Sequence, residues 1–389
     1  MNKTICNLYI TIWCLYALQG TLYSSGSIIS RFLLVFFLSF SLFFFVLALY
    51  KYKLPSVLRI LAVLIGVWTI YGGINILFGN KVSWVNNYEY LKSIYLSLLP
   101  IYAFYVFAKK GVLTDSLLRY WTVVFVPVII AYYYHMVDLR LQEGFYSNSR
   151  DEFANSAAYS FVSILPLVPL FYKKPFVQYV LIGICMVFIL MGMKRGALLT
   201  GSIAVIWFLF TSLQGKNEKQ HSKQFWRVLF TGIIILVAVI VVRHFLTTSE
   251  LFNARVEQTL AGDSSGRDRI FTSYSQFVLN DMSFLDLLIG KGADGTVRIF
   301  GQYAHNDWLE IAIDNGLIVT LLFGLFIIKL FLTSRQSHKS IIIHQILGLF
   351  FISFFFKTLF SMSYNEVNVC SSSAFAYALA MMEKGSDSV

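Results

Sequence analysis

Apolar stretches recur along the whole chain and are separated by short polar segments. Most run for about 18–22 residues, the length that an α-helix needs to cross the hydrocarbon core of a bilayer. The pattern predicts about twelve helices. They lie near residues 5–23, 32–50, 57–78, 91–108, 117–137, 153–172, 175–193, 195–213, 228–246, 316–333, 341–361 and 368–383. We therefore expect an all-α, polytopic integral membrane protein, with residues 1–389 forming a single membrane domain.

Composition agrees with this pattern, because 57% of the residues are hydrophobic and only 13% are charged. The first stretch follows Lys3 and ends without a small-residue cleavage pattern, so we interpret it as a retained helix and not as a signal peptide. All four cysteines fall within apolar spans, and their spacing fits neither a disulfide framework nor a zinc site. No carboxylates stand at metal-ligand spacing, so neither a metal nor another cofactor is expected.

The basic residues indicate the orientation of the chain. With the N-terminus in the cytoplasm, the inner loops carry most of the cations, as the positive-inside rule requires. These are Lys51, Lys53, Lys109, Lys110, Lys173, Lys174, Lys216, Lys219, Lys223, Arg227, Arg335 and Lys339. Both termini are then cytoplasmic, and residues 247–304 form one larger extracytoplasmic loop. Topology and anionic membrane lipid explain the net charge of +11, and no nucleic-acid motif is present.

The loop 247–304 has mixed charge and is therefore not a solvating tail. Apolar groups recur within it at residues 270–271 and 284–289, which predicts short helices packed on the outer membrane face. The glycines at 290, 292 and 295 resemble a phosphate-binding loop only superficially, because the Gly-Lys-Ser/Thr ending is missing. We interpret them as a turn, and nucleoside triphosphates are not expected as substrates.

Residues 304–310 stand between this polar loop and the next apolar span. The last four of them fit the spacing of a capping box, so a helix is predicted to start here and to break near residues 315–316. His305 then lies just outside the helix N-terminus, where the helix dipole disfavours imidazolium. A neutral histidine there can act as a general base. The alternative is that Asn306 or Asp307 caps the helix and His305 is a polar interfacial residue.

A second candidate is Arg195, which follows Lys194 at the outer junction of two apolar spans. Ionisable groups at such a depth are costly unless they are paired or face a wet cavity, so they are functional candidates. Gly196 and Ala197 are small enough to let another group approach closely. The competing interpretation is that both cations snorkel to the outer headgroups.

A third candidate is the pair Arg267 and Arg269 in the outer loop. Guanidinium groups match phosphate oxygens in a bidentate fork, although local pairs with Asp268 would explain these arginines equally well. A neutral histidine and several arginines on one face suit transfer from a lipid-linked diphosphate. In that reaction the acceptor hydroxyl loses a proton while charge develops on the leaving diphosphate.

The stretch from Arg267 to Leu322 resembles the signature region of the bacterial O-antigen ligase and polymerase family. The motifs that carry the likeness are Gly266-Arg267, Ile270-Phe271, Leu287-Leu288-Ile289-Gly290-Lys291-Gly292, Ala304-His305-Asn306-Asp307-Trp308-Leu309-Glu310 and Asn315-Gly316-Leu317-Ile318. Met193-Lys194-Arg195-Gly196-Ala197 is similar to an arginine-glycine junction found earlier in such proteins. The family-like region thus covers residues 195–333.

The resemblance implies a multi-helix, metal-independent glycosyltransferase of the bacterial inner membrane. Such an enzyme takes undecaprenyl-diphosphate-linked oligosaccharide on the extracytoplasmic face and joins it to an acceptor glycan or to lipid A-core. His305, Arg195 and Arg267 correspond to the family's catalytic residues. Lys194, Asn306, Arg269 and Arg298 are expected to bind substrate. Departures from the family pattern at Phe271 and Val319 leave the alignment of the loop arginines open, so Arg269 and Arg298 are also alternatives to Arg267.

Between the two branches, the moderate size of the outer loop favours a polymerase of O-antigen or other surface polysaccharide repeat units, with a chain-length regulator as a partner. The first alternative is a ligase that transfers the glycan to lipid A-core. The second is a transporter or flippase of lipid-linked sugars, for which internally repeated halves are typical, and no such repeat is present.

Overall fold

The structure is a computed structural model, and it confirms the predicted all-helical membrane protein. It describes residues 2–24, 26–78, 84–143, 155–213, 267–336, 340–360, 363–364 and 368–386, with a few single positions between 214 and 266. Throughout these residues the chain forms helices and connecting turns, with no β-strand. The predicted helix at 228–246 lies outside the described residues.

Seven helices among the described residues are long and apolar enough to cross a membrane. They belong to α2 (Ile28–Lys51), α3 (Ser56–Phe78), α4 (Trp84–Lys109), α5 (Asp115–Glu143), α8 (Arg195–Leu213), α14 (Asp307–Gln336) and α15 (Ile341–Phe360). Shorter helices complete the bundle: α1 (Lys3–Ala17), α7 (Pro175–Met191) and α16 (Val369–Ser386). The expectation of about twelve spans is thus met in part.

One predicted span is wrong. Residues 153–172 were expected to form a single helix, but the chain forms the short α6 (Ala158–Val162) and then the 3-10 helix η2 (Leu165–Phe171). Pro166 and Pro169 both fall within η2. Proline lacks the N–H that an α-helix needs, and two prolines three residues apart remove two such bonds within one turn. Helices α4 and α5, by contrast, each continue past a single proline.

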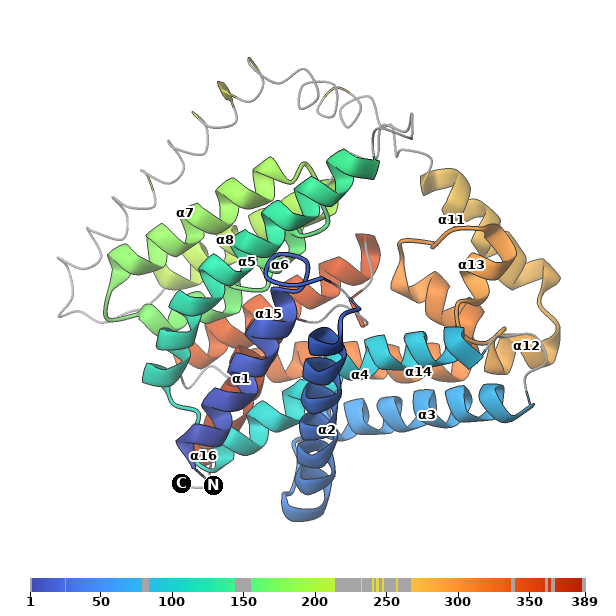
Figure 1. The fold of residues 1–389 in the computed structure, drawn as a ribbon, viewed down its shortest axis with the longest axis horizontal. Coiled ribbons are helices and arrows are strands. Elements are labelled where there is room, and N and C mark those ends of the chain that lie inside the picture. The colour runs from blue at the N-terminus through green and yellow to red at the C-terminus, as the bar shows by residue number, and fades with distance from the viewer. Residues whose placement is uncertain are drawn as a thin grey trace.

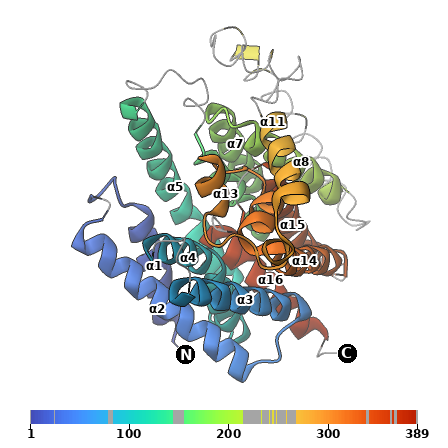
Figure 2. The same cartoon turned by 90° about the vertical axis from the view of Figure 1, so that its right-hand side faces the viewer.

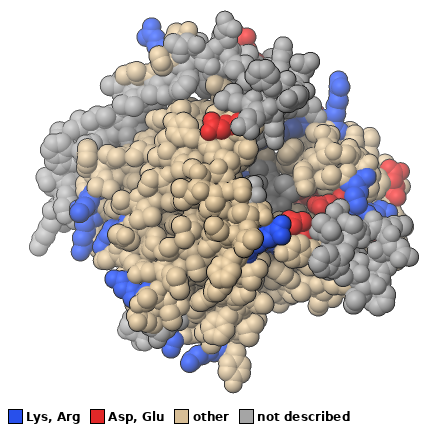
Figure 3. Space-filling model, viewed as in Figure 1, with Lys and Arg blue, Asp and Glu red and all other residues tan. Residues whose placement is uncertain are grey.

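Helix α4 lies at the centre of the bundle, where it packs against α2, α3 and α16 (Figure 1). Its aromatic residues Tyr102, Phe104 and Phe107 are fully buried, and the Tyr102 hydroxyl donates to the Leu58 carbonyl at 2.7 Å. Helix α2 instead leaves large apolar side chains exposed, among them Phe32 and Phe43. Few charged side chains interrupt the face shown in Figure 3. Such an apolar exterior is stable only against lipid.

A lobe of short helices follows the part of the chain around residues 214–266. It consists of α11 (Arg267–Gln276), a π-helical turn (Phe277–Asp281), α12 (Phe284–Ile289) and α13 (Gly295–Phe300). Short helices were predicted for this region. In Figures 1 and 2 the lobe lies away from the end of the bundle where both termini are found.

Helix α14 begins at Asp307 and breaks at Gly316, as the sequence predicts. The Gly316 backbone has φ 75° and ψ 179°, a conformation essentially confined to glycine. The α12 end of the lobe packs into this break, so that a Cβ atom at residue 316 would collide with the carbonyl oxygen of Leu288. The break therefore fixes the lobe against the bundle.

Gly316→Ala is expected to destabilise the fold by about 3 kcal/mol, because it combines a forbidden backbone conformation with a clash. Thermal unfolding of the detergent-solubilised protein measures this as a lowered Tm. Gly324→Ala is the matched control on the same helix, since its Cβ would meet only Trp308 side-chain atoms at 3.6 Å or more. Equal Tm values for the two variants would contradict the assigned role of the break.

Candidate functional site

His305 stands immediately before α14 and has a left-handed backbone, with φ 54°. Its N–H donates to Glu310 Oε1 at 2.9 Å, which holds this unusual conformation in place. The predicted capping box is wrong in register. Asn306, not Asp307, is the cap, and its Oδ1 accepts from the Leu309 N–H at 3.2 Å. The placement of His305 just outside the helix N-terminus is confirmed.

Asp307 and Glu310 belong to the first turn of α14 as predicted, but both are buried, at 0% and 1% exposure. Asp307 accepts hydrogen bonds from the backbone N–H of Ser363, at 2.9 Å, and from the Ser363 hydroxyl. Buried carboxylates require such partners because their desolvation is costly. Asp307 thereby ties the start of α14 to the segment that follows α15.

The C-terminal end of α15 connects the histidine motif to the arginine motif, which lie more than a hundred residues apart in the sequence. Trp308 Nε1 donates to Thr358 Oγ1 at 3.1 Å, and Asn306 Nδ2 donates to the Leu359 carbonyl at 3.5 Å. On the arginine side, a Cβ atom at Gly196 would lie 2.8 Å from Phe360 Cβ. Both motifs therefore contact α15, at the consecutive residues 358–360.

Arg195 is the first residue of α8, and both it and the preceding Lys194 are half-buried. The sequence predicted that Gly196 allows a close approach, and the structure identifies the approaching groups as Tyr159 Oη and Phe360. Helix α8 is thus packed tightly beside its first residue, which fixes the position from which the Arg195 side chain extends.

Arg267 and Arg269 lie in the first turn of α11, with Arg267 half-buried and Arg269 exposed. Tyr274 anchors this helix to the segment before His305. Its hydroxyl donates to the Gln302 carbonyl at 2.8 Å, and its ring stacks on Phe300 at 3.9 Å between centroids. Burial raises the pKa of Tyr274 to about 12, so the hydroxyl remains a donor at neutral pH.

Arg298 has a structural role inside the lobe. Its guanidinium donates to the carbonyls of Lys291, at 2.6 Å, and Ala293, at 3.3 Å. The backbone N–H groups of Lys291 and Gly292 donate to carbonyls of α14. These groups cannot also cradle a phosphate, which confirms the interpretation of this glycine-rich stretch as a turn.

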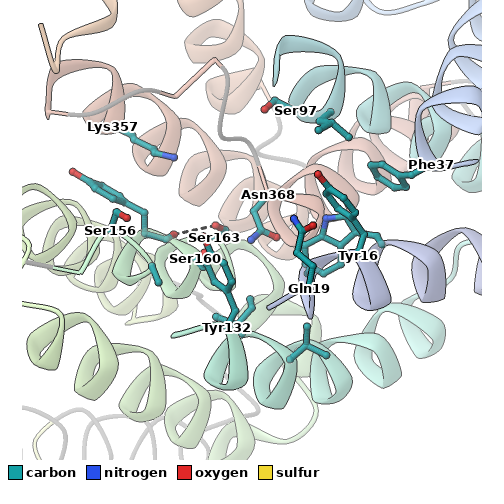
Figure 4. Close-up of a pocket in the computed structure, with 17 residues that line it drawn as sticks. Tyr16, Gln19, Phe37, Ser97, Tyr132, Ser156, Ser160, Ser163, Lys357 and Asn368 are labelled. Atoms are coloured by element: carbon teal, nitrogen blue, oxygen red, sulfur yellow. Dashed lines mark hydrogen bonds between the residues drawn. The ribbon is translucent and has the colours of Figure 1, made fainter. Parts of the chain in front are cut away.

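A polar pocket of about 300 Å³ lies among α1, α2, α4, α5, α6 and α15 (Figure 4). Serine hydroxyls and amides line much of it: Gln19, Ser97, Ser156, Ser160, Ser163 and Asn368. A second cavity of about 30 Å³ shares Ser163 and Asn368 with the pocket and adds Ser363, the residue bound to Asp307. Cavities lined by polar residues therefore extend from the pocket toward Ser363, which is bound to the first residue of α14.

Lys357 of α15 lines both cavities and was missed by the sequence analysis. Its Nζ lies 5.2 Å from the centroid of the Tyr159 ring, a cation–π distance. A lysine within the apolar run Phe354-Phe355-Phe356-Lys357 was a detectable signal, because ionisable residues inside membrane spans are functional candidates. The pocket itself gave no such signal, since its residues come from six separate helices and the segments that connect them.

Burial raises the pKa of Asp294 in the lobe above its usual range, and the nearby Arg298 charge opposes this shift. No group of three or more histidine, cysteine or acidic residues that could hold a metal occurs within the part of the chain that is described.

Comparisons with protein-family models, with curated proteins and with solved structures found no match to this chain. The family resemblance therefore stays a prediction carried by the motifs themselves.

Proposed function

We propose that this protein is a membrane glycosyltransferase that acts on undecaprenyl-diphosphate-linked glycan at the extracytoplasmic face of the bacterial inner membrane. The observation that carries the proposal is the meeting of the His305 and Arg195 motifs at residues 358–360 of α15. His305 and Arg195 are distant in the sequence, but the motifs that contain them both contact the C-terminal end of α15.

In the proposed reaction, His305 accepts the proton of an acceptor hydroxyl as that oxygen bonds to the anomeric carbon of the donor sugar. The bond between this carbon and the diphosphate oxygen breaks, and the diphosphate leaves with its electron pair. Arg195 and Arg267 stabilise the charge that develops there, because a guanidinium binds phosphate oxygens in a bidentate fork. Lys194 and Arg269 add positive charge for donor binding.

Two candidate binding residues receive different roles in this mechanism. Asn306 supports the site by capping α14 and by its bond to Leu359, so it positions the adjacent His305. Arg298 stabilises the turn of the lobe. Both act through backbone contacts and not through a contact with substrate.

The product is best explained as a polymer of lipid-linked repeat units, since the outer loop is only moderately long. Transfer to lipid A-core and transport of a lipid-linked sugar are the alternatives. The orientation, with both termini cytoplasmic and the lobe outside, is supported by the placement of the lobe away from the termini (Figures 1 and 2).

His305→Ala is expected to reduce transfer by about 100-fold or more, because the acceptor hydroxyl loses its general base. The test is a gel profile of surface polysaccharide from a strain that lacks this gene and is complemented with wild type or with the variant. His244→Ala, at an exposed histidine, is the matched control and should restore the wild-type profile.

Each alternative gives a different profile in the strain that lacks the gene. A single repeat unit attached to lipid A-core indicates a lost polymerase, whereas lipid-linked polymer without attachment indicates a lost ligase. An unchanged ladder would argue for a transporter. A normal ladder with the inserted, folded His305→Ala protein would exclude this histidine as the base.

Arg195→Lys should remain impaired by about tenfold or more, because an ammonium is a point charge that cannot reproduce the bidentate fork. Initial rates of polymer formation by the purified protein, with lipid-linked repeat units as substrate, measure this loss. Arg335→Lys serves as the control at the predicted cytoplasmic end of α14. Full activity of Arg195→Lys would reduce Arg195 to a membrane anchor.

Ser273→Cys, at an exposed position of α11, is expected to react with a membrane-impermeant thiol reagent applied to intact spheroplasts. Lys110→Cys, also exposed, should react only after the membrane is permeabilised. The four native cysteines are buried and give little background. The reverse labelling pattern would overturn the proposed orientation.

A further inference from the structure

The exposed side chains of the lobe differ in character from one helix to the next. Those of α11 are all polar: Asp268, Arg269, Thr272, Ser273 and Gln276. Those of α12 are all large and apolar, with Phe284 77%, Leu285 64% and Ile289 41% exposed. At 3.6 residues per turn these three lie within about 140° of one another around the helix axis, so they form one apolar face. Leaving such a face in water is unfavourable.

The one charged residue of α12 is neutralised locally. Asp286 accepts hydrogen bonds from Lys291 Nζ, at 2.5 Å, and from the Ser283 hydroxyl, at 2.6 Å. Ser283 in turn caps the helix, because its hydroxyl oxygen accepts from the Asp286 N–H at 3.2 Å. A charge close to hydrocarbon is costly unless it is paired. The pairing of Asp286 therefore lowers the cost of placing α12 at a membrane surface.

Helix α12 is attached to the bundle at the point where the lipid-facing part of α14 begins. From Asp307 to Gly316 no residue of α14 is exposed, whereas a stripe of apolar side chains is exposed beyond the break. The stripe includes Leu317, Ile318, Leu321, Leu325 and Ile328. At the break itself, the Leu288 carbonyl of α12 packs against Gly316 (Figure 1). Helix α12 thus adjoins one end of the stripe.

The length of the stripe indicates the depth of α12. The rise from Leu317 to Arg335 is about 27 Å in an α-helix. The hydrocarbon core of a bilayer is about 30 Å thick. With Arg335 at the polar boundary on one side of the membrane, Leu317 lies near the boundary on the other side, and α12 lies beside it. An amphipathic helix that binds a membrane surface occupies this depth.

We propose that α12 is an interfacial membrane helix, with Phe284, Leu285 and Ile289 inserted among the lipids of the leaflet next to Gly316. The sequence predicts short helices on the outer membrane face, and the exposed side chains assign the lipid contact to α12 and the water-facing surface to α11. Lipid fits the apolar face better than a partner protein does, because the face adjoins a stripe that is itself lipid-facing. Neither the transferase reaction nor the identity of the leaflet is needed for this contact.

Spin labels on single cysteines test the insertion directly. Phe284→Cys and Leu285→Cys would be labelled in nanodiscs of phosphatidylcholine and phosphatidylglycerol, where the four native cysteines are buried and give little background. Power-saturation EPR then compares collisions with oxygen, which concentrates in lipid, and with a water-soluble nickel complex. Both labels are expected to collide mainly with oxygen, at a depth of about 5–10 Å. Ser273→Cys on α11 is the matched control and should collide mainly with nickel.

Leu321→Cys, in the stripe of α14, provides the reference value for a lipid-facing position, since Leu321 is 69% exposed. Nickel collisions at residues 284 and 285 equal to those at residue 273 would place α12 in water and overturn the insertion. Exclusion of both oxygen and nickel from residues 284 and 285 would indicate that a protein covers the face, and would overturn it as well. An unchanged Tm of the labelled variants shows that the fold is retained.

Discussion

At Gly316 the backbone of α14 leaves the helical region, and the carbonyls of Ile313 and Asp314 lose the partners that a continuous helix would give them. Lys291 and Gly292 supply the replacement, donating their N–H groups to these carbonyls at 2.7 and 2.8 Å. The unpaired end of one helix thus becomes the docking point of the lobe. Without the break, the lobe would lose these two backbone hydrogen bonds to α14.

The same break leaves a short, buried helical segment between His305 and Asn315, and several of its polar groups bond to neighbouring elements. Asp314 Oδ1 accepts from the Thr296 N–H of α13 at 2.8 Å. Asn315 Oδ1 accepts from Tyr90 Oη of α4 at 3.0 Å and from Trp68 Nε1 of α3. A segment fixed at both ends can hold His305 in its left-handed conformation, because the surrounding contacts outweigh the local strain.

Sequence patterns within single segments predicted those features of the fold that neighbouring residues determine. Hydropathy located the seven spans found among the described residues, and the polar motif before residue 316 located the start and the break of α14. Competition between neighbouring side chains was harder to predict, because Asn306 and Asp307 can both cap a helix and only the burial of Asp307 against Ser363 decides between them. The polar pocket could not be predicted, since serines scattered over several apolar spans acquire a shared surface only through packing.

The location of the polar groups bears on the choice between the proposed enzyme and the alternative transporter. A transporter must expose its site to both sides of the membrane, and its polar groups gather near the midplane. Here Lys357 and the His305 motif belong to helix ends on one side of the bundle, whereas the pocket also reaches mid-helix residues such as Ser97 of α4 and Ile129 of α5. At the opposite ends of α4 and α16, Lys109 forms an ion pair with Glu383 at 2.9 Å. Under the proposed function, the position of the His305 motif at a helix end is the feature that favours substrates arriving and leaving through the same leaflet.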